Sequence, residues 1–177
     1  MDQRKLKTRQ SIEKAFLRLR KEKSVEEISV TELSRLARIS KATFYLHYND
    51  IFDLSEKMQT SAISQVLDQI PISICVMDHW PEFAKEMMAI MDQDSTVLTI
   101  LFSGSQMAMI PALLENGIRE RILEQSPELK DNSELSIRLT YHIQGSYHAY
   151  LRHAHHTDVR QILDIIDDIH HKAGMNM

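Results

Sequence analysis

Residues 30–48 combine small side chains with hydroxyl, amine and imidazole groups over two short, closely spaced segments. Ser40 is a good N-cap for a short helix. The opening turns of that helix would hold Ala42, Thr43 and Tyr45. A helix that enters the major groove of DNA needs small side chains for close approach and hydrogen-bond donors for phosphates and base edges. The segment supplies both and therefore predicts a surface that contacts DNA.

A second short helix is expected just before this one. Thr31 is a suitable N-cap, and Leu33, Leu36 and Ala37 form an apolar stripe behind it. The two helices would be joined by a tight turn, as in a helix-turn-helix. A longer helix over residues 6–23 precedes them and would supply the packing face. Its apolar positions at helical spacing are Ile12, Ala15, Phe16 and Leu19.

The composition favours a mostly helical protein that acts in the cytoplasm. The 177 residues include only four Gly and four Pro, which are few for this length. The single cysteine, Cys75, excludes an intrachain disulfide and suits a reducing compartment. The charged N-terminus has no apolar run behind it, so no signal peptide is expected, and no stretch approaches the roughly 20 apolar residues of a membrane span.

The charge is distributed unevenly along the chain. The net charge is −4, but residues 1–50 hold 12 Lys and Arg against 7 Asp and Glu, a balance of +5. The remaining residues hold 9 against 18, a balance of −9. A basic head on an acidic body is expected when only the head meets a polyanion, although a solvated basic helix gives the same pattern.

The chain divides into two predicted domains near residue 50. Residues 1–50 form the three-helix head, and Asp50 can cap a fourth helix that runs from residue 51 to residue 70, where Pro71 stops it. Residues 51–177 form a helical body. Further helices are expected over residues 81–91, 95–102, 110–123, 135–153 and 158–170. Asn132 or Ser133 can cap the helix over residues 135–153.

From Ala37 to Asp50 the sequence ARISKATFYLHYND resembles the tetracycline-repressor (TetR) family of transcriptional regulators. The matching features are Ser40-Lys41, Thr43-Phe44-Tyr45, His47-Tyr48 and the capping residue Asp50. The resemblance covers about residues 8–58. The body is similar to the family only in its helical character and length.

The resemblance implies that Thr31, Tyr45 and His47 contact phosphates. It places Lys41, Ala42 and Leu46 nearest the base edges and Phe44 in the core. The aromatic residues also allow another interpretation, a half-buried cluster against the first helix. With the residues that open the helix, the expected DNA-contacting set is Thr31, Ser40, Lys41, Ala42, Thr43, Tyr45, Leu46, His47 and Tyr48.

The sequence departs from the family pattern at three positions. Arg38 stands where the family usually has Gly, so it must accept a strained backbone or a shifted turn. Ala42 replaces another common Gly, which favours helix. Ile51 replaces a basic residue at the start of the fourth helix, where backbone N–H groups could still bind a phosphate.

The body holds two groups of residues with chemical potential. Seven of the nine histidines follow residue 140, but their spacing does not match a metal-binding motif, so no metal site is assigned. Flexible methionines, aromatic rings and a few polar groups are the ingredients of an effector pocket, or equally of an ordinary core. The candidates for the pocket are Trp80, Phe83, Met87, Met91, Phe102, Met107, Tyr141, Gln144 and His148.

These observations predict an all-α, two-domain transcriptional regulator that acts as a ligand-responsive repressor, not an enzyme, and needs no cofactor. Two copies would bind a palindromic operator, because one short recognition helix gives limited affinity. Apolar stripes on the last two helices would form the dimer interface. Two alternatives remain open: a helical metal-binding protein or enzyme that uses the C-terminal histidines, and an adaptor that binds a protein through the head.

Overall fold

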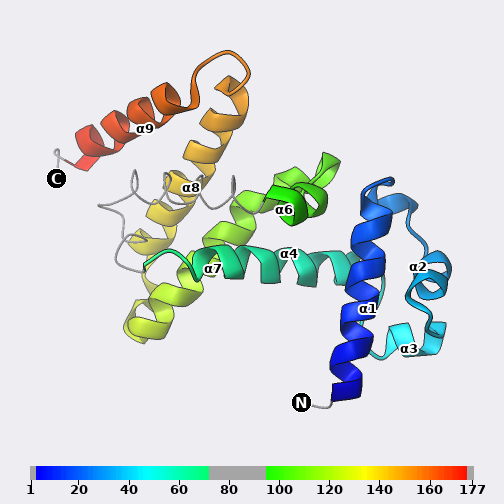
Figure 1. Cartoon of the computed structure of the whole chain (residues 1–177). Coiled ribbons are helices and arrows are strands. Elements are labelled where there is room, and N and C mark those ends of the chain that lie inside the picture. Colours follow the sequence, from blue (N-terminus) through cyan, green and yellow to red (C-terminus); the bar gives the residue numbers. More distant parts are fainter. Residues whose placement is uncertain (1–2, 72–94, 175–177) are drawn as a thin grey trace. The chain divides into compact units, whose positions relative to one another are not determined.

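The computed structural model describes residues 3–71 and 95–174, and within these ranges every regular element is a helix. The α-helices are α1 (Gln3–Arg20), α2 (Val30–Ala37), α3 (Lys41–Tyr45), α4 (Ile51–Leu67), α6 (Ser95–Leu101), α7 (Ile110–Gln125), α8 (Ser133–His153) and α9 (Val159–Gly174). Short 3₁₀ turns occupy Val25–Glu27, Gly104–Met109 and Pro127–Asp131. The all-α prediction is therefore confirmed (Figure 1). None of the described helices is long and apolar enough to cross a membrane.

The described residues fall into two compact units, and α4 runs from the first into the second. The first unit holds residues 3–62 and 95–108, and the second holds residues 63–71 and 109–174. The first unit thus contains the predicted head together with most of α4 and the short helix α6. The functional division at residue 50 stays a prediction.

The three N-terminal helices share one core. α1 buries the face that the helical spacing predicted, which is Ile12, Ala15, Phe16 and Leu19. Leu33 of α2 and Phe44 of α3 are fully buried in the same unit, as is Leu54 of α4. Ile28, which lies in the connection between α1 and α2, is also buried. Packing of these apolar side chains, rather than the propensity of two such short helices, stabilises α2 and α3.

A buried arginine holds the end of α6 against α1 within the first unit. The Nη2 atom of Arg20 donates to the carbonyl oxygens of Ile100 and Ser103, both at 3.2 Å, and to Ser103 Oγ at 2.7 Å. Burial lowers the pKa of Arg20 from its ordinary value. The carbonyls at the C-terminal end of a helix carry partial negative charge, so they suit a buried cation.

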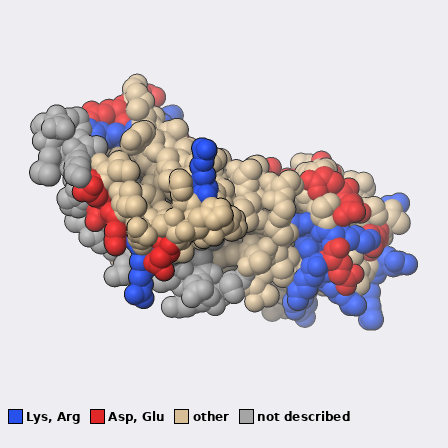
Figure 2. Space-filling model, turned by 90° about the horizontal axis from the view of Figure 1, so that it is seen from above, with Lys and Arg blue, Asp and Glu red and all other residues tan. Residues whose placement is uncertain are grey.

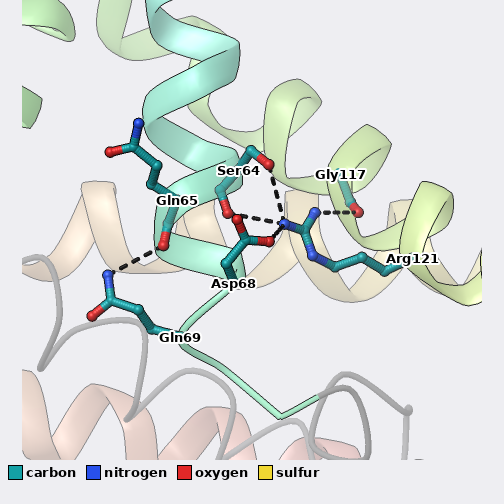
Figure 3. A network of polar contacts seen from close by, with 6 residues as sticks. All are labelled: Ser64, Gln65, Asp68, Gln69, Gly117 and Arg121. Carbon is teal, nitrogen blue, oxygen red and sulfur yellow. Dashed lines mark hydrogen bonds and ion pairs between the residues drawn. The ribbon is translucent and has the colours of Figure 1, made fainter.

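In the second unit, α7 packs closely on the last turns of α4. Arg121 of α7 binds the carbonyl oxygen and the hydroxyl of Ser64, and it forms an ion pair with Asp68 (Figure 3). A Cβ atom at Gly117 would lie 2.6 Å from Leu67 Cδ1, which is closer than such atoms approach one another. Glycine at this position therefore permits the contact between the two helices.

Most of the expected helices and caps are confirmed. Ser40 caps α3, Asp50 accepts from the Asp53 N–H at the start of α4, and Asn132 caps α8. The predicted cap at Thr31 is wrong, because Ser29 accepts the Glu32 N–H at 3.2 Å and caps α2, which begins at Val30, two residues earlier than expected. The helix expected over residues 81–91 lies outside the described residues.

Candidate nucleic-acid interface

The turn between α2 and α3 is fixed by one residue in a left-handed conformation. Arg38 has φ 57° and ψ 44°, and the Ile39 N–H donates to the Ser34 carbonyl at 3.0 Å to close the end of α2. The resemblance left a strained backbone or a shifted turn open at this position, and the structure shows the first of these. A non-glycine residue in this region costs roughly 1–2 kcal/mol, which the surrounding core must offset.

Phe44 anchors α3 to the head. Its side chain is fully buried. The centre of its ring lies 5.5 Å from the ring centre of Tyr45 and 5.8 Å from that of Tyr48. Since Phe44 points inward, the residues that flank it on α3 point outward. Tyr45 is 56% exposed, and Lys41 and Ala42 are also exposed. The core thus determines which face of α3 is free.

Tyr48 belongs to the core rather than to this free face. Only 4% of its surface is exposed, and its hydroxyl donates to Glu13 Oε1 of α1 at 3.2 Å. Burial, with the nearby Glu13 carboxylate as a second cause, raises the pKa of Tyr48 to about 12. The ammonium group of Lys57 lies 5.4 Å from the centre of the ring. We therefore remove Tyr48 from the expected DNA-contacting set and assign it to the packing of α1, α3 and α4.

The remaining members of the set lie at the surface of the head. Thr31, Ser40, Lys41, Ala42, Tyr45 and Leu46 are exposed, and Thr43 and His47 are partly exposed. The Thr43 hydroxyl lies 2.8 Å from Ser40 Oγ, which also accepts the Thr43 N–H, so this pair closes the start of α3. Together these residues present an amine, a phenol, an imidazole and three aliphatic hydroxyl groups on α2, α3 and the residues next to α3.

The start of α4 is poorly suited to bind a phosphate, although its backbone N–H groups were expected to do so. The Asp53 N–H already donates to Asp50 Oδ1, and the Asn49 N–H donates to Asp53 Oδ2, both at 2.8 Å. The hydrogen bond from Lys57, with that from Asn49, holds the pKa of Asp53 below its ordinary value. Two carboxylates at this helix end would repel a phosphate, so the expected backbone contact there is not retained.

Many basic side chains lie at the end of the molecule that holds the N-terminal helices (Figure 2). Figure 2 shows Lys and Arg there, interspersed with patches of Asp and Glu. The first turn of α1 contains no acidic residue, although basic groups at a helix N-terminus oppose the helix dipole. The exposed basic residues of α1 are Arg4, Lys5, Lys7, Arg9, Lys14 and Arg18. This arrangement lowers helix stability and favours an anionic partner.

Sequence reasoning missed three residues that build the site. Ser29 and Glu32 fit the Ser-x-x-Glu pattern of a helix start, which would have identified the cap of α2. Glu13 carries no comparable signal. It binds both Arg9, at 2.6 Å, and the Tyr48 hydroxyl, and this role depends on the packing of helices far apart in the sequence.

Among the residues that the structure describes, the candidates for the pocket do not form one cluster. Trp80, Phe83, Met87 and Met91 lie outside the described residues. Phe102 is buried in the first unit, where Met107 is exposed. Gln144 of α8 donates to Glu115 of α7 at 3.4 Å.

Two further candidates on α8 are exposed. Tyr141 is 60% exposed and His148 is also exposed, so the described residues alone do not enclose these two side chains in a pocket.

The histidines of the described body are mostly at the surface. His153, His155 and His156 are exposed at the end of α8, whereas His142 is buried, and burial lowers its pKa. Among the described residues no group of three or more His, Cys, Asp or Glu could hold a metal ion. The side chains of His170 and His171 are outside this description.

A short helix, a left-handed turn and a second helix with an exposed polar face define a helix-turn-helix protein. The chain is similar to the uncharacterized HTH-type transcriptional regulator YxbF of Bacillus subtilis (strain 168), with 31% identity over 74 residues. This segment is 41% of the chain but 20% of YxbF, so the similarity spans a small part of that relative. At the level of class, it supports a helix-turn-helix regulator. No protein-family model and no solved structure matches the chain.

Proposed function

We propose that the protein is a DNA-binding transcriptional regulator of the TetR type, a ligand-responsive repressor that binds a palindromic operator in the cytoplasm as a homodimer. The observation that carries this proposal is the free face of α3, which the buried Phe44 turns outward within a basic head. The similarity to an HTH-type regulator supports the same class. In this proposal Lys41, Ala42 and Leu46 face the base edges. Thr31, Tyr45 and His47 contact phosphates.

A salt titration of binding to duplex DNA tests this proposal against an adaptor that binds a protein. DNA affinity should fall linearly with salt on logarithmic axes, because each neutralised phosphate releases counterions. If basic side chains of a dimer neutralise six phosphates, the slope would be about −5. Fluorescence anisotropy of a labelled duplex gives this slope directly. A slope near zero, or no binding at low salt, would exclude the role of the head in DNA binding.

The dimer would form through α8 and α9. One face of α8 exposes Ile137 (68%), Tyr141, Gly145 and His148 at helical spacing, and a Cβ added at Gly145 would meet nothing within 4 Å. On α9, Ile165 and Ile169 are about half exposed. Apolar side chains on two neighbouring helices suit a four-helix interface between two copies.

The α9 stripe serves two purposes in this proposal. Ile162 and Ile166 of the same stripe are buried within the chain, so only half of the predicted α9 face is available to a partner. The buried half closes the core of the second unit, and the exposed half would add to the interface. A single apolar stripe that is wider than the core contact leaves one edge free for a partner.

Replacing Ile137 with glutamate should convert the dimer to a monomer. The new carboxylate would face its own copy across a two-fold interface, where charge and desolvation both oppose association. Sedimentation equilibrium should give about half the mass of the native assembly, with unchanged helical circular dichroism. The matched control is Val97→Glu, an equivalent change at another exposed apolar residue, on α6. A native protein that sediments as a monomer, or a variant that stays dimeric, would refute this interface.

The ligand response would be a population shift. An effector bound in the body would favour one position of α4, which is continuous with the head, and so change the separation of the two recognition helices. An effector can do this only if it binds one arrangement more tightly than the other. The support for an effector site is the composition of the body, which contains methionines, aromatic rings and a few polar groups.

A further inference from the structure

Leu46 is unusually exposed for a large apolar residue. It directly follows α3, and 83% of its surface is accessible, more than for any other large hydrophobic residue described. Its backbone has φ −73° and ψ −16°, and its N–H donates to the Ala42 carbonyl at 3.2 Å. The helical turn therefore continues through Leu46, which places its side chain one turn beyond the methyl group of Ala42 on the same face.

Leu46 and Ala42 have no evident role in the packing of the head. The core position of this segment is taken by Phe44, which is fully buried, and Ala42 is exposed like Leu46. We call the side chains of Ala42 and Leu46 the methyl face of α3. An apolar side chain that stays exposed contributes no burial free energy to folding. Burial of the methyl face in a complex would therefore favour binding.

The polar groups around the methyl face identify the kind of partner. Lys41 lies exposed beside it, and the hydroxyl of Thr43 is already engaged with Ser40. The head carries a balance of +5 over residues 1–50. A partner must therefore combine dense negative charge with small apolar groups, and the major groove of DNA does so. Its apolar feature is the C5-methyl group of thymine.

We propose that the methyl face reads thymine C5-methyl groups in each operator half-site, through contacts of Leu46 and Ala42. This inference rests on the proposed function, since it needs α3 to enter the major groove. It predicts an operator in which thymine, rather than guanine or cytosine, is required at one or two positions of each half-site. Lys41 would supply the neighbouring hydrogen-bond donor.

The test uses the full-length protein and begins with an operator selected from random duplexes. Each thymine is replaced in turn by deoxyuridine, which removes only the C5-methyl group. Loss of one methyl contact should weaken binding about fourfold, and the symmetric change in both half-sites about fifteenfold. Leu46→Ala should weaken binding to the thymine operator. The variant should then bind the thymine and the deoxyuridine operators equally well, because the methyl contact is already lost. The matched control is Phe52→Ala, an exposed apolar residue at the start of α4.

The outcomes separate this inference from the proposed function. A selected operator whose uracil versions all bind the native protein equally well would overturn the methyl reading and leave the regulator intact. Additive losses from Leu46→Ala and from uracil would also overturn it, because contacting groups must be coupled. If selection gives no preferred sequence, the proposed function fails, and the inference fails with it. Retention of the native helical spectrum by Leu46→Ala confirms that the comparison concerns folded protein.

Discussion

Replacing Lys41 with alanine should weaken operator binding about 10-fold for each half-site, and therefore about 100-fold for a dimer. Lys41 is the exposed cation at the first position of α3, next to the methyl face, and no side-chain contact within the head occupies it among the described interactions. Its ammonium group can donate to guanine or to a phosphate. Fluorescence anisotropy at one fixed salt concentration gives the loss of affinity.

The salt dependence then identifies what Lys41 contacts. A phosphate contact would reduce the steepness of the salt slope by about one for each lysine removed, whereas a base contact would relax the sequence preference at one position. Lys130→Ala is the matched control, since it removes the same charge from an exposed site in the second unit. Equal losses for the two variants would mean that net charge, not the position of Lys41 on α3, governs binding.

Replacing Phe44 with alanine should destabilise the head by about 3–5 kcal/mol. The ring is fully buried and holds α3 against the core, where it contacts the rings of Tyr45 and Tyr48. A loss of this size is a large part of the roughly 5–15 kcal/mol that keeps a domain folded. Thermal unfolding followed by circular dichroism should show a strongly lowered midpoint, and DNA binding should be lost with it.

Leu46→Ala is the matched control for this prediction. It truncates a large apolar side chain only two residues away, but the side chain is exposed, so stability should change by less than about 0.5 kcal/mol. The contrast tests whether the core holds Phe44 while Leu46 is free. If both variants unfold alike, or if Phe44→Ala costs less than about 1 kcal/mol, α3 is not held in the way described here.

The sequence predicted those features of the fold that depend on local pattern. Helical spacing identified the buried face of α1, and Ser40, Asp50 and Asn132 identified the starts of three helices. The family resemblance identified Arg38 as a position where glycine is usual, which left a strained backbone or a shifted turn open, and the structure shows the left-handed conformation. These features require no knowledge of distant contacts.

Features that depend on packing between distant segments could not be predicted in this way. Tyr48 is equally compatible with a DNA contact and with a core position, and its bond to Glu13, 35 residues away, decided between them. The hydrogen bonds from Arg20 to the end of α6 have no local signal either, because the acceptors are backbone carbonyls about 80 residues further along the chain. On α8, periodicity defined a stripe but not whether Tyr141 faced inward or outward.

The most direct test of the central claim is selection of duplexes from a random-sequence pool by the full-length protein at near-physiological salt, followed by sequencing. The account predicts a palindrome whose half-sites lie about one helical turn apart, which would establish operator recognition and the dimer together. Weak, salt-sensitive binding with no enriched sequence would contradict it, since the exposed face of α3 would then have no base to read.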